Sequence, residues 1–187
     1  SAMVGYVLQR RQDRWADLVT VLMLAGLVVP PAIVPTIYVL QSIGLFKTLI
    51  GMVLVEVAIL MPFSVLVFRA FVSAIPRELD EAALMDGASP FTLFFKVILP
   101  LLRPAMITVI VVASVGIYND FTGPLYFLPG SDNATVQATL FQFASQWSTQ
   151  WNLLFADVLF ITIPPLIMFI FFQRQLVAGM TAGAVKG

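Results

Sequence analysis

Residues 76–100, PRELDEAALMDGASPFTLFFKVILP, form the polar interruption that decides the fold, because long apolar runs flank it on both sides. The stretch holds four of the chain's ten acidic residues. Its helix start and stop residues are typical of two short helices. Pro76 suits a first helical position, and Gly87 suits a left-handed helix end. Ser89-Pro90 predicts an N-cap and the start of a second helix, which Pro100 then breaks or kinks. The sequence therefore predicts a compact helix pair between membrane spans.

The composition is that of a membrane protein. The chain has 187 residues, of which 60% are hydrophobic and 11% charged, and its mean hydropathy is +0.97. Soluble domains carry about 25% charged residues. The formal net charge is zero, which argues against a nucleic-acid partner. Cysteine and histidine are absent from the sequence, so we expect no catalytic residues, no metal site and no cofactor.

Four apolar runs approach or exceed the roughly 20 residues that a membrane-spanning helix needs. The first run contains Pro30, Pro31 and Pro35, which bend a helix and require neighbours to satisfy the freed carbonyl groups. Residues 2–8 are too short to span and look like the end of a transmembrane helix, so we expect a fragment lacking its N-terminal helices. Residues 134–147 predict a short helix at the membrane surface. The predicted spans are residues 15–40, 48–71, 101–118 and 153–172.

The basic residues predict the orientation of these spans. An alternating four-span topology places every basic residue except Lys47 on one side. Because cytoplasmic segments carry the excess of Lys and Arg, the 76–100 loop and the tail are predicted to be cytoplasmic. Residues 41–47 and 119–151 are then predicted to face outward.

Part of the 76–100 loop resembles a known motif. Glu81-Ala82-Ala83, then Gly87, then Val97 and Leu99-Pro100 resemble the "EAA" loop of binding-protein-dependent ABC importer permeases. The family pattern has Ile where this chain has Val97, which keeps a β-branched apolar side chain. In that family the loop is cytoplasmic and fits a cleft on the ATPase subunit. The resemblance implies that Glu81, Ala82, Ala83, Gly87, Leu99 and Pro100 couple the chain to an ATPase.

Two further segments strengthen this resemblance. Tyr118-Asn119-Asp120-Phe121, followed by Gly123-Pro124-Leu125, resembles the WNDF…PL segment of carbohydrate-type importer permeases, with Tyr in place of Trp. The tail, FQRQLVAGMTAGAVKG at residues 172–187, resembles the C-terminal signature of maltose-type permeases. In the maltose case the tail reaches into the ATPase dimer, which implies a contact role for Thr181, Gly183 and Lys186. By composition alone the tail is a flexible end.

The resemblance implies an all-α fold, a polytopic transmembrane helix bundle of the ABC importer permease type with a cytoplasmic coupling-helix loop. Residues 1–187 would form one permease domain of a multi-pass inner-membrane protein. The implied partners are an ABC ATPase dimer, a second permease subunit, an extracytoplasmic solute-binding protein, a sugar substrate and the lipid membrane. ATP hydrolysis is expected in the partner, since the chain lacks a G-x-x-x-x-G-K-[ST] phosphate loop.

Three polar residues are candidates for the solute pathway. Glu56 lies near the middle of the second predicted span, where an ionisable residue is costly and indicates a pathway or partner contact. It is equally compatible with a carboxyl group bonded to a neighbouring backbone. Asn119 and Asp120 end the third span and could hydrogen-bond sugar hydroxyls, although both residue types are also common at helix ends. The alternative function is an ion-coupled secondary transporter or channel subunit that uses Glu56.

Overall fold

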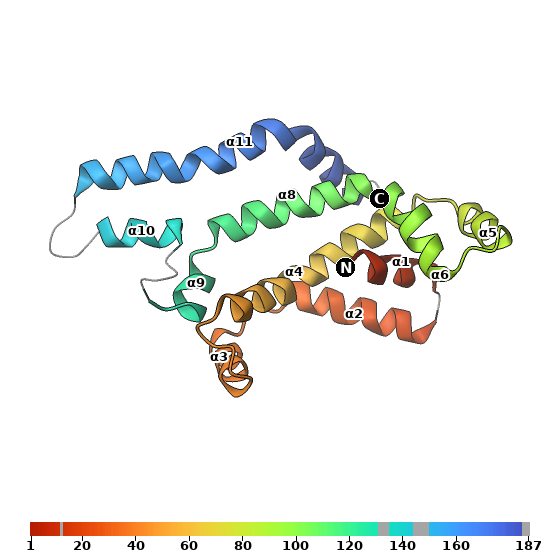
Figure 1. Ribbon diagram of the computed structural model, residues 1–187, viewed down its shortest axis with the longest axis horizontal. Helices are drawn as coiled ribbons and strands as arrows, with labels where there is room; N and C mark the ends of the chain where they lie inside the picture. The colour runs from red at the N-terminus through yellow and green to blue at the C-terminus, as the bar shows by residue number, and fades with distance from the viewer. Residues whose placement is uncertain (12, 131–134, 144–149, 185–187) are drawn as a thin grey trace. The chain divides into compact units, whose positions relative to one another are not determined.

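The computed structural model describes residues 1–11, 13–130, 135–143 and 150–184 (Figure 1). Within these ranges the regular elements are helices, with no strand, so the predicted all-α class is confirmed. The chain divides into two compact units. Unit 1 comprises Ser1–Val29, Ile59–Val112 and Arg174–Gly187, and unit 2 comprises Pro30–Ala58 and Ala113–Gln173.

Three helices run from one unit into the other, namely α4 (Leu49–Val72), α8 (Arg103–Asn119) and α11 (Trp151–Ala184). The remaining helices of unit 1 are α1 (Ala2–Arg10), α2 (Arg14–Val28), α5 (Glu78–Met85), α6 (Pro90–Thr92), the π-helix η1 (Leu93–Ile98) and α7 (Leu99–Leu101). The remaining helices of unit 2 are α3 (Ile33–Ser42), α9 (Thr122–Phe127) and α10 (Val136–Phe143).

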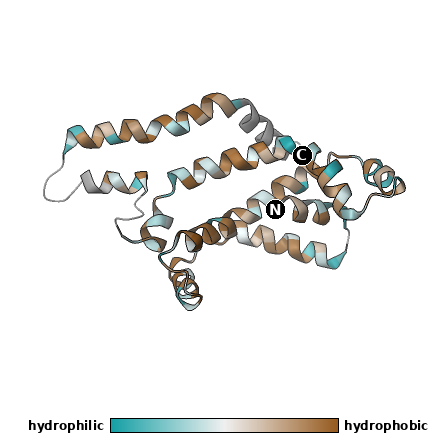
Figure 2. Ribbon diagram, in the orientation of Figure 1, coloured by the Kyte–Doolittle hydropathy of each residue, from teal (hydrophilic) through white to brown (hydrophobic). Residues whose placement is uncertain are grey.

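Two helices are long and apolar enough to cross a membrane by themselves, α4 and the Trp151–Gln173 part of α11. Hydrophobic residues predominate along both (Figure 2). These helices match the predicted spans 48–71 and 153–172 closely. Two further helix pairs qualify only if each counts as one broken span, α2 with α3, and Pro90–Leu101 with α8. The chain is therefore a membrane protein with two to four candidate spans.

The predicted first span, residues 15–40, is two helices and not one. Its break follows from Pro30 and Pro31, because a residue before proline is pushed out of the helical region. Val29 accordingly takes an extended conformation, with φ −70° and ψ 123°. Pro35 lies in the first turn of α3, where its missing N–H leaves no hydrogen bond unmade.

The sequence predicted a break or kink at Pro100. The structure has the break two residues later, at Leu102. Helical structure continues to Leu101, Leu102 leaves the helix with φ −82° and ψ 4°, and α8 then departs at 71°. Pro104 accounts for the position, because its ring would clash with the carbonyl of Pro100, four residues earlier, in a continuous helix. The irregular geometry begins earlier, as the π-helical turn η1 immediately precedes α7.

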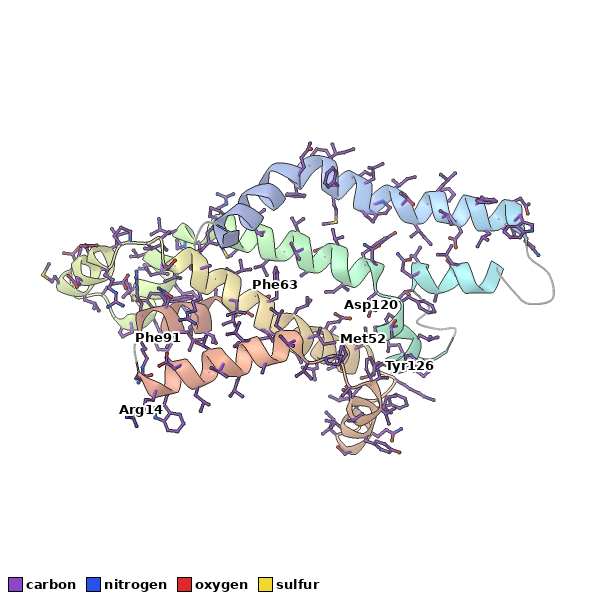
Figure 3. The ribbon with its side chains drawn as sticks, turned by 180° about the vertical axis from the view of Figure 1, so that it is seen from behind. Arg14, Met52, Phe63, Phe91, Asp120 and Tyr126 are labelled. Carbon is purple, nitrogen blue, oxygen red and sulfur yellow. The ribbon has the colours of Figure 1, made fainter. Side chains whose placement is uncertain are left out.

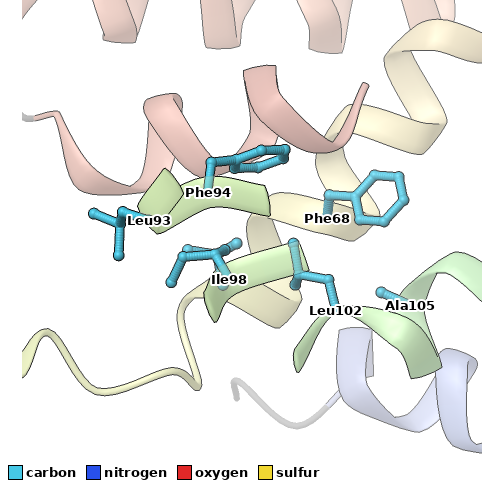
Figure 4. Packing of buried hydrophobic residues seen from close by; sticks show 7 residues of the cluster. Phe68, Leu93, Phe94, Ile98, Leu102 and Ala105 are labelled. Carbon is cyan, nitrogen blue, oxygen red and sulfur yellow. The ribbon is translucent and has the colours of Figure 1, made fainter. Parts of the chain in front are cut away.

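A buried hydrophobic cluster holds the 76–100 loop to unit 1 (Figure 4). Ile98 and Leu102 are fully buried, so they occupy the centre of this packing. The cluster connects α4, η1 and α8, and it gives the loop a fixed seat on the two long helices. Its members are Phe68, Val72, Leu93, Phe94, Ile98, Leu102 and Ala105.

The N-terminal helix α1 packs closely on α4. A Cβ atom added at Gly5 would lie 2.8 Å from the Cβ of Phe68 and 2.9 Å from backbone atoms of Val65 and Arg69. Arg69 of α4 also donates hydrogen bonds to Gln9 of α1 (3.3 Å) and Thr20 of α2 (2.9 Å). One arginine thus ties three helices together near the predicted cytoplasmic side.

Unit 2 has its own small core. Leu40 of α3 packs with Met52 and Val55 of α4, and with Phe127 and Leu128 at the end of α9. Burying these five side chains fixes α9 beside the N-terminal half of α4. Only Asp120 and Phe121 separate the end of α8 from α9, so this packing also positions the candidate pathway residues Asn119 and Asp120.

Candidate functional site

The 76–100 loop begins with a short acidic helix. Glu78, Asp80 and Glu81 lie in the first turn of α5, where carboxylates favour a helix N-terminus. The prediction that Pro76 takes the first helical position is wrong by two residues, because α5 starts at Glu78. The carbonyls of Ile75 and Pro76 instead accept hydrogen bonds from Arg10 Nη2, at 3.1 and 3.4 Å, which holds the entering segment outside the helix.

Gly87 ends α5 as predicted. Its φ is +80°, the left-handed region that favours glycine. The N–H of Ala88 donates to the carbonyl of Ala83, and that of Gly87 donates to Leu84, both at 3.0 Å. This pair of bonds is the Schellman motif, which satisfies the last carbonyls of the helix and turns the chain.

The second helix of the loop also begins as predicted. Ser89 is the N-cap, its hydroxyl accepts from the N–H of Thr92 at 3.2 Å, and Pro90 follows at the first helical position. The helical stretch Pro90–Leu101 then runs through η1 into α7. Two short helices joined by Gly87 are therefore confirmed as the structure of the loop.

The six predicted coupling residues divide into two groups. Ala83 and Leu99 pack against the unit 1 cluster, so they hold the loop in place. Glu81, Ala82, Gly87 and Pro100 are exposed, so they are accessible to a partner. The motif thus combines an anchoring side and an accessible side on one small element.

Large apolar side chains next to the motif are exposed as well. Met85 is 85% exposed, Phe91 69% and Leu84 50%. Phe91 projects from the first turn of the second helix (Figure 3). An apolar group of this kind, beside exposed carboxylates, is typical of a protein-docking surface. Sequence reasoning missed these three residues, although their apolar character within a polar segment was a usable signal.

An ion pair that the sequence did not reveal joins α1 to α5. Arg10 Nε lies 2.6 Å from Asp80 Oδ2, and Arg10 Nη2 lies 3.3 Å from Asp80 Oδ1. Tyr6 Oη donates to the same Oδ2 atom at 3.1 Å. Asp80 stands next to the Glu81 of the motif, so the ion pair fixes the first turn of the candidate coupling helix.

In unit 2 the structure brings two of the three candidate pathway residues together. The carboxyl groups of Glu56 on α4 and of Asp120, the residue that follows α8, are direct neighbours. Both Asp120 oxygens accept the N–H of Gly123, at 3.2 and 3.0 Å. Met52, one turn from Glu56, also borders Gly123, and Figure 3 shows Met52 and Asp120 in this region. Asn119 is exposed beside them.

The polar groups around Asn119 connect α8 to α10 and α11. Tyr118 Oη donates to the carbonyl of Ile161 at 3.2 Å, and Gln137 Nε2 donates to the carbonyl of Tyr118 at 3.1 Å. Thr139 donates to Asp157 at 2.8 Å. Carboxyl, amide and hydroxyl groups of this kind can hydrogen-bond a polyhydroxylated solute. Among the residues that the structure describes, no three acidic side chains converge as a metal site.

The tail continues α11 as a helix, whereas its composition alone predicted a flexible end. Helix α11 extends to Ala184, and it therefore includes Thr181 and Gly183. Lys186 lies outside the described residues, as does the C-terminal part of the predicted surface helix 134–147. Within that predicted helix, α10 covers Val136–Phe143.

Comparison with known proteins assigns the family. The family described as "Binding-protein-dependent transport system inner membrane component" matches residues 1–182. The chain is 32% identical over 189 residues to a Bacillus subtilis protein named "Probable ABC transporter permease protein YurM", covering 100% of this chain and 63% of that one. It is 30% identical over 194 residues to the B. subtilis "Arabinooligosaccharides transport system permease protein AraQ", covering 100% and 66%. It is 33% identical over 189 residues to the Streptomyces coelicolor "Diacetylchitobiose uptake system permease protein NgcG", covering 99% and 63%. The chain thus spans just under two thirds of the length of these relatives.

A solved structure shares the fold. It is described as a bacterial ABC transporter involved in the import of the acidic polysaccharide alginate. The TM-score is 0.74 at 18% sequence identity, and the match covers 91% of this chain and 65% of the other. Fold, loop geometry and sequence agree, and the chain belongs to the family of inner membrane components of binding-protein-dependent transport systems.

Proposed function

We propose that this chain is a permease subunit of an ATP-driven importer and forms part of the translocation pathway for a sugar or oligosaccharide. The names of its relatives support this solute class, since they refer to arabinooligosaccharides, diacetylchitobiose, and melibiose, raffinose and stachyose. The subunit is a multi-pass protein of the inner membrane, and residues 1–187 belong to a single permease domain. It works with a second permease subunit and an external solute-binding protein.

The observation that carries the proposal is that the 76–100 loop has one side packed against the protein and one side exposed. One side is seated in the buried cluster through Ala83 and Leu99. The other side exposes Leu84, Met85 and Phe91 together with the carboxylates of Glu81 and Asp86. A protein partner with an apolar cleft and a basic rim fits this surface, because apolar burial supplies affinity and opposite charges set the orientation. We assign this partner as the ATPase dimer.

The loop is coupled to the long helices because it is packed tightly against α4 and α8. Ile98 and Leu102 are fully buried between α4 and α8, so the loop cannot shift without these helices. Closure of the ATPase on ATP would therefore move the loop and the inner ends of both helices as one body. Rigid-body motion of packed elements is a common way of switching between two states of access.

The solute pathway is proposed to pass the polar group of unit 2. Glu56 and Asp120 supply neighbouring carboxyl groups, and Asn119 supplies an exposed amide. Ionisable residues in a membrane protein face a cavity or another polar group, which favours a pathway position. We expect Glu56→Gln to change the apparent KM for the imported sugar while leaving the ATPase contact intact. An unchanged KM would assign Glu56 a structural role.

The tail is proposed as a second ATPase contact. Its helical continuation to Ala184 extends the chain beyond the apolar part of α11. Thr181, Gly183 and Lys186 are the residues of this contact. Truncation after Gln173 is expected to weaken ATPase binding without displacing the 76–100 loop.

The absence of cysteine makes the main proposal directly testable. In the full-length subunit in membranes, Met85→Cys is expected to crosslink to the ATPase, with a yield that changes on adding ATP. Met61→Cys is the matched control, since Met61 lies within the span α4 and should not react with the ATPase. No crosslink from Met85→Cys or Phe91→Cys in a verified complex, together with uptake that is independent of the ATPase, would overturn the proposal. Uptake driven by an ion gradient would then favour a secondary transporter.

A further inference from the structure

The ion pair between Arg10 and Asp80 is built differently from the other ion pair in the described part of the chain. Its side chains are only 14% and 13% exposed, and the guanidinium engages both carboxylate oxygens. The other pair joins Arg11 and Asp13, which are only two positions apart in the sequence, and the Arg11 side chain is 64% exposed. Exposed local pairs of that kind contribute little, whereas removing one partner of a shielded pair leaves an uncompensated charge.

The remaining donors of Arg10 extend the contact to the chain that enters α5. Nη2 reaches the carbonyls of Ile75 and Pro76, so one guanidinium holds the entering segment and the first turn of α5 together. Planar guanidinium groups suit such multiple contacts better than an ammonium group does. The position of α5 is thereby fixed at its N-terminal end.

Tyr6 adds a link to the other half of the loop. Its hydroxyl donates to Asp80, and its ring packs against Phe94 of η1 with a centroid distance of 5.8 Å. Phe94 belongs to the buried cluster of unit 1. Helix α1 therefore contacts both α5 and η1, and through Gly5 it also packs on α4.

We propose that Tyr6, Arg10 and Asp80 form a clamp that makes α1 and α5 move as one body during the transport cycle. These are positioning residues, since the Arg10 and Asp80 side chains are largely shielded, whereas the docking residues Met85 and Phe91 are exposed. Displacement of α5 by the ATPase would then reach α4 by two routes, directly through the buried cluster and indirectly through α1. The inference rests on the proposed coupling function of the 76–100 loop.

The clamp predicts a fixed distance between α1 and α5. Spin labels at Val4→Cys and Glu78→Cys, both exposed positions, report this distance in the full-length subunit assembled with its partners. We expect one narrow distance distribution that is the same with and without ATP. Asp80→Asn is expected to broaden the distribution and make it shift on adding ATP.

Transport measurements test the consequence. In proteoliposomes, Asp80→Asn and Arg10→Gln are expected to lower the amount of sugar imported per ATP hydrolysed about tenfold, while the Met85→Cys crosslink to the ATPase persists. The matched control is Arg11→Gln, which removes the exposed pair and should leave both readouts unchanged. If Asp80→Asn does not assemble, Tyr6→Phe removes only one hydroxyl donor and should still broaden the distance distribution.

Two results would overturn the clamp. One is a distance that changes with ATP in the unmodified subunit. The other is a set of clamp variants in which uptake and ATP hydrolysis fall in equal proportion and the distance distribution stays narrow, as a purely structural role predicts. Failure of the coupling function itself is recognised separately, because Met85→Cys would then give no crosslink to the ATPase even in the unmodified clamp.

Discussion

Asp120 accepts the backbone N–H of Gly123 with both carboxylate oxygens, at 3.2 and 3.0 Å. This contact closes the chain into the turn that leads from α8 into α9. A Cβ atom added at Gly123 would collide with Asp120 Oδ2 and lie 2.7 Å from Met52 Cε. The turn, the Asp120 carboxylate and the N-terminal half of α4 are therefore packed against the same glycine.

Gly123→Ala is expected to disrupt this arrangement. Met52 can move its terminal methyl group, but the Asp120 carboxylate must give up its hydrogen bonds to the turn. We expect a loss of sugar uptake and a lower Tm of the assembled subunit. Gly116→Ala is the control, because a Cβ atom there meets nothing within 4 Å. In α8 that change should keep or raise the Tm, since alanine is the better helix former. Normal uptake by Gly123→Ala would show that the turn does not constrain the pathway.

Gly87→Ala is expected to weaken the turn of the 76–100 loop through backbone strain alone. An added Cβ atom meets nothing within 4 Å, but φ is +80°. Left-handed backbone costs an ordinary residue roughly 1–2 kcal/mol. The hydrogen-exchange protection of the Ala88 amide, which bonds to Ala83, should fall about tenfold, as 1.4 kcal/mol corresponds to a factor of ten.

Gly87→Asn is the comparison that separates strain from other effects. Asparagine tolerates the left-handed region better than alanine does, so its loss of protection should be smaller. An equal loss of protection in Gly87→Ala and Gly87→Asn would mean that backbone strain at position 87 is not the cause of the loss.

Much of the fold followed from the sequence because the signals were local. Run length and hydropathy placed α4 and α11, and the residue types at Gly87, Ser89 and Pro90 placed the helix ends of the loop. Each of these depends on residues within a few positions of one another. The first predicted span was wrong as a single helix, because the paired prolines at 30 and 31 end the helix and do not only bend it.

The contacts of the candidate site were beyond the reach of a single sequence. Arg10 and Asp80 are separated by 70 positions, and no local pattern states that they meet. The same holds for Glu56 and Asp120, which were singled out separately, for depth in a span and for a helix-end motif. Their pairing depends on how α4 packs against the end of α8, and the apolar pattern of either helix alone does not specify it.

The N-cap of α2 gives a prediction for pH. Asp13 accepts the N–H of Ala16 at 2.8 Å, and this hydrogen bond, with help from the Arg11 guanidinium, lowers the pKa of the Asp13 carboxyl. A carboxyl whose pKa is lowered by folding stabilises the fold above the pKa of the unfolded chain. That contribution is lost as pH falls through the folded-state pKa.

The measurement is the protection factor of the Ala16 amide, corrected for the intrinsic exchange rate at each pH. It should be constant near neutral pH and decline below the ordinary aspartate pKa of 3.8. Asp13→Asn keeps an acceptor oxygen at every pH, so its protection should show no such decline. A decline of equal size in Asp13→Asn would assign the effect to another group.

Gly5→Ala tests the contact between α1 and α4. The added Cβ atom would lie 2.9 Å from the carbonyl oxygen of Val65 and from the amide nitrogen of Arg69, and these backbone atoms cannot move without bending α4. Overpacking of this kind costs typically 1–3 kcal/mol, so the Tm of the full-length subunit should fall. Gly26→Ala is the graded comparison, because its Cβ atom meets only the Pro62 ring, at 3.1 Å, and should lower the Tm less. If Gly5→Ala were as stable as the unmodified subunit, α1 would not be seated on α4, and displacement of α5 could reach α4 only through the buried cluster.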